Sequence, residues 1–201
     1  MQRNWLIPLL WALASISSTW SAGTTVSPGC GTLPADIYFL LDASGSVGVT
    51  NFQKQKDFIV KFANAFDIGP NNVQIGVTTF STAVYQQFFM NAHQDKASLI
   101  QAIKNIPYQS GSTYTDKAIK YVAANAFTKP HGDRDHVVNI LITMTDGQSN
   151  NHAATVAEAN NLHKLPIESF AIGIGSGIRR DELNSIASDS SKVFTVTNFD
   201  A

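Results

Sequence analysis

The feature that most constrains the fold of this chain is a repeated alternation of apolar runs with amphipathic segments. Residues 36–41 and 136–145 are largely apolar and lack a polar face of helical period, which is typical of strands buried on both faces of a sheet. Residues 51–66 instead repeat large apolar side chains at intervals of three, four and seven, with lysines between them. That pattern predicts an amphipathic helix.

The same patterns continue to the end of the chain. Further strands are predicted at 73–80, 84–89, 167–175 and 193–196, and further helices at 94–106, 115–127, 153–163 and 178–187. The link between 73–80 and 84–89 is too short for a parallel return, so 84–89 is expected to be an antiparallel edge strand. The sequence therefore predicts an α/β fold with a doubly wound, mostly parallel sheet and helices on both faces.

Composition limits the number of domains and the class of partner. The chain has 201 residues, of which 44% are hydrophobic, enough for one α/β domain. Its 14 basic and 15 acidic residues give a formal net charge of −1. A chain with so little net charge has no long-range field to attract nucleic acid or an anionic membrane, so neither is expected as a partner.

The amino-terminal segment has the pattern of a secretory signal. Residues 1–22 contain one positive charge, Arg3, then an apolar stretch over 5–16 and small residues, which predicts a signal peptide and secretion. The apolar stretch is shorter than the ~20 residues that span a bilayer, and no later stretch reaches that length. Residues 23–34 are rich in Gly, Thr, Ser and Pro and are predicted to be a linker into a domain at 35–201.

Cys30 is the single cysteine of the chain. An odd cysteine in a secreted protein normally has a partner, so Cys30 is expected either to pair between chains or to pair with a cysteine outside this sequence.

Polar residues that could bind a metal follow two of the predicted buried strands. Asp42, Ser44 and Ser46 lie in the first loop (residues 42–48), and Asp146 begins the third loop (residues 146–151). Both loops come at the carboxyl end of a strand, where doubly wound sheets bind ligands. Two carboxylates at one edge repel each other unless a cation lies between them. Mg²⁺ takes about six oxygen ligands, often with only one or two carboxylates. The alternative is that these side chains cap helices.

A second loop (residues 111–116) precedes the predicted helix at 115–127 and belongs to the same edge. Thr113 and Thr115 are both candidates for the capping hydroxyl of that helix, and the one that does not cap it can offer its oxygen to a metal.

An enzyme is the main alternative function. A secreted hydrolase could use Ser44 or Ser46 as nucleophile, but neither lies in a Gly-x-Ser-x-Gly motif. His152 is the histidine nearest the predicted site, and it or another base would have to lie within hydrogen-bond reach of a serine. Nucleotide binding is not favoured, because no Gly-x-Gly-x-x-Gly or Walker loop follows the first strand.

Together the three loops resemble the metal-ion-dependent adhesion site of von Willebrand factor type A domains. The resemblance rests on Asp42-Ala-Ser44-Gly-Ser46, Thr113-Tyr-Thr115 and Thr145-Asp146-Gly147, in that order along the chain. The segments ADIYFLLDASGSV and VFTVTNFDA are similar to extracellular-matrix members of the family, those of type VI collagen and the matrilins. The resemblance implies a Rossmann-like fold.

The resemblance also implies a site and a function. One Mg²⁺ or Mn²⁺ would be held by Asp42, Ser44, Ser46, Thr113 and Asp146. An acidic side chain of collagen or another matrix protein would complete its coordination, so the chain is expected to be a non-enzymatic adhesion or assembly module of the extracellular matrix. The residues expected to touch the partner are Tyr114, Gln148, Asn150 and Asn151. Family members usually end with one more helix and often a cysteine, so the chain is expected to be part of a longer, multi-module protein in which Cys30 finds its partner.

Overall fold

The computed structural model describes residues 33–175 and 177–196. Its strands are β1 (Ala35–Asp42), β2 (Val73–Phe80), β3 (Val84–Phe88), β4 (Val138–Thr145), β5 (Glu168–Ile174) and β6 (Val193–Val196). Its helices are α2 (Gly48–Asn64), α3 (Lys96–Lys104), α4 (Thr115–Asn125), α5 (His152–Leu162) and α6 (Arg180–Ile186), with short 3₁₀ turns η2 (Lys129–His131) and η3 (Ser190–Lys192). Every strand and helix predicted from the sequence within these residues is present.

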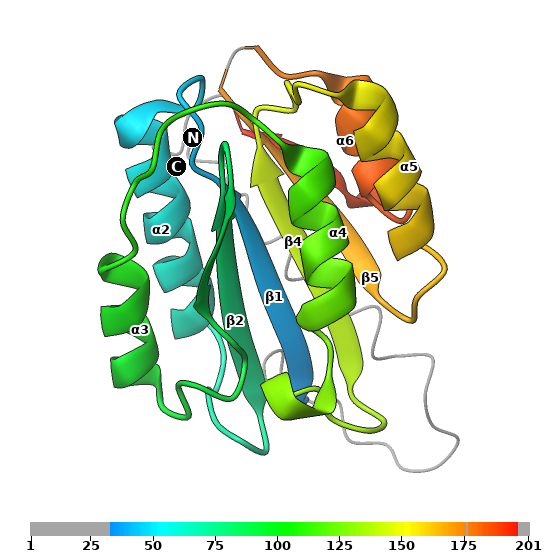
Figure 1. Ribbon diagram of the computed structural model, residues 1–201. Helices are drawn as coiled ribbons and strands as arrows, with labels where there is room; N and C mark the ends of the chain where they lie inside the picture. Colours follow the sequence, from blue (N-terminus) through cyan, green and yellow to red (C-terminus); the bar gives the residue numbers. More distant parts are fainter. Residues whose placement is uncertain (1–32, 176, 197–201) are drawn as a thin grey trace.

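The strands form one sheet in the order β3-β2-β1-β4-β5-β6. All neighbouring pairs are parallel except β2 with β3, which are antiparallel, and β3 lies at the edge of the sheet. The prediction of a mostly parallel, doubly wound sheet with one antiparallel edge strand is therefore confirmed. Figure 1 shows the strands side by side, with the carboxyl ends of the parallel strands at the upper edge.

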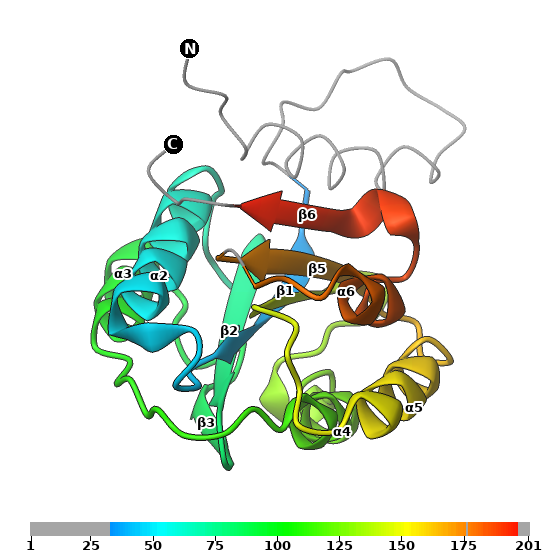
Figure 2. The same cartoon turned by 90° about the horizontal axis from the view of Figure 1, so that it is seen from above.

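Helices cover both faces of the sheet, as Figure 2 shows from above. Alternate residues of β1 point to opposite sides: Ile37, Phe39 and Leu41 join the core under α2 and α3. Tyr38 and Leu40 join the core under α4, α5 and α6. Because β1 is buried along both faces, its sequence is a continuous apolar run, as expected for a central parallel strand.

Helix α2 begins three residues earlier than the predicted 51–66. Its first turn is closed without a side-chain cap: Val47 at the N-cap makes no such bond, and the Gly48 N–H donates to the Ser44 carbonyl at 3.3 Å. The first loop is consequently short, and its polar residues lie directly between β1 and α2.

At the opposite edge of the sheet, where the parallel strands begin, an ion pair joins a buried aspartate to a partly buried arginine. Asp36, at the start of β1, is fully buried, and Arg134 Nη2 lies 2.7 Å from its Oδ1. The Arg134 guanidinium also donates to the carbonyls of Pro70, Ala35 and Asn72 at 2.9, 3.1 and 2.7 Å. The Arg134 side chain thus joins the start of β1 to the segments that precede β2 and β4.

Within the described residues, no helix is long and apolar enough to cross a membrane. The predicted signal peptide, most of the predicted linker, Cys30 and residues 197–201 lie outside the described part of the chain. The predictions about them stay predictions.

Candidate functional site

The three loops meet where the strand order reverses. β1 lies between β2 and β4, so the connections after β1 and β4 leave the sheet in different directions at its carboxyl edge. Leu41 of β1 is paired with Met144 of β4, which brings the residues that follow, Asp42 and Thr145, next to each other.

Asp42 is fully buried, and hydrogen bonds hold both of its carboxylate oxygens. Oδ1 accepts from the Ser44 N–H at 2.9 Å, and Oδ2 accepts from Thr145 Oγ1 at 2.7 Å. Its backbone carbonyl accepts from Gln55 Nε2 at 2.9 Å. Burial raises the pKa of Asp42 to about 6; the charge of Asp146 acts in the same direction, while the hydrogen bonds from Ser44 and Thr145 oppose the rise. Asp42 therefore braces the first and third loops and caps no helix.

The serines of the first loop lie next to each other. Ser44 Oγ and Ser46 Oγ are 3.1 Å apart; Ser44 is buried and Ser46 is exposed. The Tyr108 hydroxyl donates to the Ser44 carbonyl at 2.9 Å. The Gly45 N–H donates to the Gly111 carbonyl at 2.8 Å, so the first loop is attached directly to the second.

The second loop is attached to the third through Thr113. The Thr113 N–H donates to Asn150 Oδ1 at 2.5 Å, and the Asn150 N–H donates back to the Thr113 carbonyl at 2.8 Å. The expectation that Thr113 or Thr115 caps the following helix is wrong: Tyr114 is the N-cap residue of α4, and it makes no side-chain cap bond. Thr115 Oγ1 is buried and has no hydrogen-bond partner in the described part of the chain. Both hydroxyls are thus free of the capping role.

Asp146 lies at the start of the third loop and is 5% exposed. Its Oδ1 accepts from the Gln148 N–H at 3.1 Å, and its carbonyl accepts from the Arg179 N–H at 3.3 Å. The loop therefore turns back on itself and also contacts the segment that leads into α6.

Thr145 is the residue that the sequence analysis did not place in the site. It is fully buried; its hydroxyl donates to Asp42 Oδ2 and accepts from the Gly147 N–H at 2.9 Å. One hydroxyl thus links the two carboxylate loops. Its position in the Thr145-Asp146-Gly147 motif was the signal available in the sequence.

The donor atoms of this site suit a hard divalent cation. Asp42, Ser44, Ser46, Thr113 and Asp146 offer carboxylate and hydroxyl oxygens only, with no nitrogen or sulfur. Among the described residues, no group of three or more His, Cys, Asp or Glu side chains could hold a metal, and this site itself offers only two carboxylates. Mg²⁺ and Mn²⁺ prefer such oxygen sets, whereas thiolates and imidazoles favour softer ions. The chemistry of the donors therefore fits the predicted metal.

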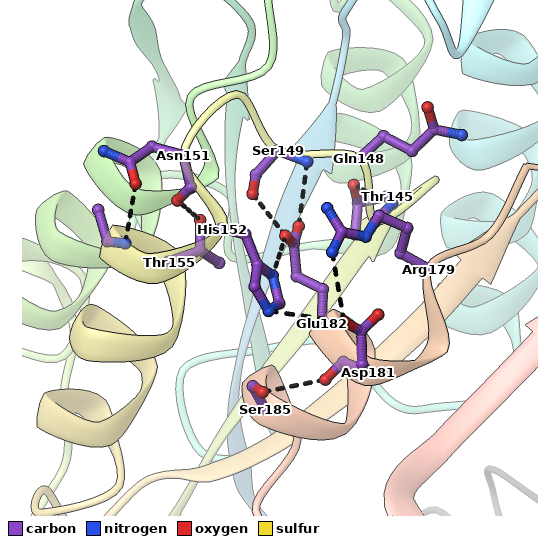
Figure 3. A network of polar contacts seen from close by, with 12 residues as sticks. Thr145, Gln148, Ser149, Asn151, His152, Thr155, Arg179, Asp181, Glu182 and Ser185 are labelled. Carbon is purple, nitrogen blue, oxygen red and sulfur yellow. Dashed lines mark hydrogen bonds and ion pairs between the residues drawn. The ribbon is translucent and has the colours of Figure 1, made fainter.

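The hydrolase alternative needs a base in contact with a serine of the first loop. His152 instead places Nδ1 2.9 Å from Glu182 Oε2 and Nε2 3.5 Å from Asp181 Oδ2, as drawn in Figure 3. Ser44 Oγ has Ser46 Oγ as its neighbour. This geometry gives no support to a nucleophile and base pair.

The four residues predicted to touch a partner lie in the second and third loops and differ in exposure and in their contacts. Tyr114 is half-buried, with Lys117 Nζ 3.8 Å from the centre of its ring. Gln148, Asn150 and Asn151 are exposed. Asn150 holds the second loop, Asn151 caps α5, and the Gln148 side chain donates to a backbone carbonyl between β5 and α6.

Comparison with known proteins gives one family. The family model of the von Willebrand factor type A domain matches residues 36–201. The chain is 35% identical to the mouse collagen alpha-4(VI) chain over 175 residues, covering 87% of this chain and 7% of the relative. It is 32% identical to human matrilin-1 over 187 residues, covering 92% of this chain and 37% of the relative. The chain thus spans a small part of each relative.

Solved structures agree on the fold. Proximal thread matrix protein 1 from the mussel byssus, in a structure with a zinc-occupied MIDAS motif, matches with a TM-score of 0.78 and 31% identity over 84% of this chain and 45% of that chain. Manganese-loaded TRAP protein of Plasmodium vivax matches with a TM-score of 0.71 and 20% identity over 82% of this chain and 68% of that chain. The second similarity supports the fold alone.

Proposed function

The chain belongs to the von Willebrand factor type A domain family, and from that premise we propose that it is a secreted, non-enzymatic adhesion or assembly module of the extracellular matrix. The observation that carries the proposal is the meeting of three loops, each bonded to the next, around two acidic side chains at the switch point of the sheet. The collagen and matrilin relatives support the extracellular setting.

The proposed metal is one Mg²⁺ or Mn²⁺, held by Asp42, Ser44, Ser46, Thr113 and Asp146. When bound, the ion supplies a positive charge with exchangeable positions that a carboxylate of a partner can occupy. The protein itself supplies the oxygens and holds them: Thr145 orients Asp42, and Asn150 fixes the backbone of Thr113. The raised pKa of Asp42 supports the proposal, because a cation would offset the burial and repulsion that disfavour its charge.

The proposed partner is a collagen or another matrix protein that presents an acidic side chain. Tyr114, Gln148, Asn150 and Asn151 would surround that contact. With a formal net charge of −1, the chain has no broad charged field, so specificity would come from the metal contact and these neighbours. The relatives are much longer than this chain, which supports a role as one module of a larger protein.

Binding to immobilised collagen and to an immobilised matrix extract tests the function. The folded protein should bind in Mg²⁺ or Mn²⁺, lose binding in excess chelator, and lose it in Asp42→Ala and Asp146→Ala. Asp57→Ala is the matched control, because Asp57 is an exposed carboxylate on α2 that accepts a hydrogen bond from Gln53 within the same helix. Equal binding with and without chelator would refute metal-dependent adhesion.

A further inference from the structure

We propose that Glu182 of α6 is a positioning residue that holds the third loop, and with it Asp146, in place from the side of the β5–α6 connection. The existence of this attachment follows from the contacts below, whereas its effect on metal affinity rests on the proposed function. Glu182 lies 36 positions after Asp146, and the sequence analysis did not single it out.

The Glu182 carboxylate is fully buried and is surrounded by donors from the third loop and the start of α5. Oε1 accepts from the Ser149 N–H at 3.2 Å, and Oε2 accepts from Ser149 Oγ at 2.5 Å. His152 Nδ1 lies 2.9 Å from the same Oε2. Figure 3 shows Glu182 between these two side chains. Burying a carboxylate removes its hydrogen bonds to water, and this is costly unless protein donors replace them. The buried Glu182 carboxylate therefore needs Ser149 and His152 beside it.

The two bonds from Ser149 fix the orientation of the loop as well as its distance from α6. The backbone N–H and the side-chain hydroxyl of one residue meet the two oxygens of one carboxylate, which leaves that residue little freedom to rotate. Ser149 is three residues after Asp146. The position of a metal ligand must be held to within about 0.5 Å, so a shift of this turn would move the Asp146 carboxylate out of position.

Two further contacts join the same segments. Gln148 Nε2 donates to the Gly177 carbonyl at 2.5 Å, and the Arg179 N–H donates to the Asp146 carbonyl at 3.3 Å. On its other side the third loop is bonded to Thr113 of the second loop. The third loop is therefore held between the second loop and the β5–α6 segment, and Glu182 provides the buried, charged contact on the α6 side.

The test is Mn²⁺ affinity, measured by calorimetry at a temperature where every variant is folded. Glu182→Gln keeps the shape but removes the negative charge that strengthens the hydrogen bonds from Ser149 and the contact with His152. We expect about tenfold weaker Mn²⁺ binding, the range seen when residues that orient metal ligands are changed. Ser149→Ala should also weaken Mn²⁺ binding. The double variant should bind Mn²⁺ no more weakly than whichever single variant binds it more weakly, because both substitutions change the same bond, from Ser149 Oγ to Glu182 Oε2.

Two controls separate positioning from a general loss of stability. Glu158→Gln makes the same substitution at a carboxylate on α5 whose ion-pair partner is Lys120, at 4.0 Å, and should leave Mn²⁺ affinity unchanged. Ile59→Val lowers stability from the core on the opposite face of the sheet and should also leave it unchanged. Unchanged affinity in Glu182→Gln, or an equal loss in Ile59→Val, would overturn the proposal.

Amide hydrogen exchange in excess chelator gives a readout that does not depend on metal binding. Glu182→Gln and Ser149→Ala should speed exchange at Gln148 and Ser149, while amides of β1 keep their protection. If the wild-type protein binds no Mn²⁺, the proposed metal site fails, and this exchange pattern alone decides whether Glu182 holds the loop. Unchanged exchange at those two amides would refute the attachment.

Discussion

Replacing Thr145 with valine should show that one buried hydroxyl holds the two carboxylate loops together. The substitution keeps the branched shape and replaces the hydroxyl with a methyl group. Two bonds are lost: the donation to Asp42 Oδ2 at 2.7 Å and the acceptance from the Gly147 N–H at 2.9 Å. The Asp42 carboxylate and the Gly147 amide are both buried, so water cannot easily replace the hydroxyl.

The size of the effect follows from the chemistry of these partners. A hydrogen bond to a charged group contributes about 1.5–3 kcal/mol, and leaving a buried donor unpaired costs about 1–3 kcal/mol. At pH 7.5 Asp42 is largely ionised, because its pKa is about 6, so the charged value applies. We expect Thr145→Val to lower the free energy of unfolding by about 3 kcal/mol, or the melting temperature by about 6–12 °C for a domain of this size.

Thr143 offers a matched control in the same strand and on the same face. It is also fully buried, but its hydroxyl has no hydrogen-bond partner among the described residues. Thr143→Val therefore removes an unpaired buried polar group and should be neutral or stabilise the protein by about 1 kcal/mol.

Urea unfolding at pH 7.5 in excess chelator, followed by circular dichroism, measures both variants without any contribution from metal. The expected order of stability is Thr145→Val below wild type, and Thr143→Val equal to or above wild type. Equal losses in the two variants would mean that any change at this end of β4 is harmful, and the argument for a specific bridge to Asp42 would be wrong.

Three further substitutions test other parts of the fold. Arg134→Met leaves the buried Asp36 carboxylate without its ion pair and should cost about 3–5 kcal/mol in urea unfolding; a loss below 1 kcal/mol would contradict the role of the pair. Gly76→Ala places a Cβ against the buried Tyr38 ring, closer than side-chain atoms normally approach, and should cost about 1–3 kcal/mol in urea unfolding; an unchanged unfolding midpoint would show that the ring can move aside. Asp95 caps α3, and its hydrogen bonds from backbone and side-chain donors lower its pKa below 3.8. The stability that wild type gains over Asp95→Ala should therefore be present at neutral pH and disappear as the pH falls below 3.8; a difference independent of pH would exclude a charge effect.

The strands and helices followed from the sequence because their signals are local. β2 was predicted at 73–80 and is observed at Val73–Phe80, since each apolar residue there is buried in a central strand. Helix starts were less accurate, as at α2, where a backbone contact from the first loop begins the helix before its periodic pattern does.

The candidate site residues could be proposed from sequence by a rule of topology. Asp42 and Asp146 each follow a buried parallel strand, and parallel strands bring their carboxyl ends to one edge. The residues alone left Thr113 and Thr115 both open as a third contributor, and only the resemblance to von Willebrand factor type A domains selected Thr113. The sequence did not show which threonine hydroxyl caps the helix at 115–127. In the structure neither Thr113 nor Thr115 is the N-cap residue of α4.

The contacts that hold the site were decided only by the tertiary structure. Thr145 reaches Asp42 because β1 and β4 pair in one register, Leu41 opposite Met144; a shift of one residue would turn the hydroxyl to the other face. Glu182 reaches Ser149, 33 residues away, because α6 packs beside α5. A sequence specifies local periodicity directly, whereas hydrogen bonds between distant segments depend on how the finished layers pack against one another.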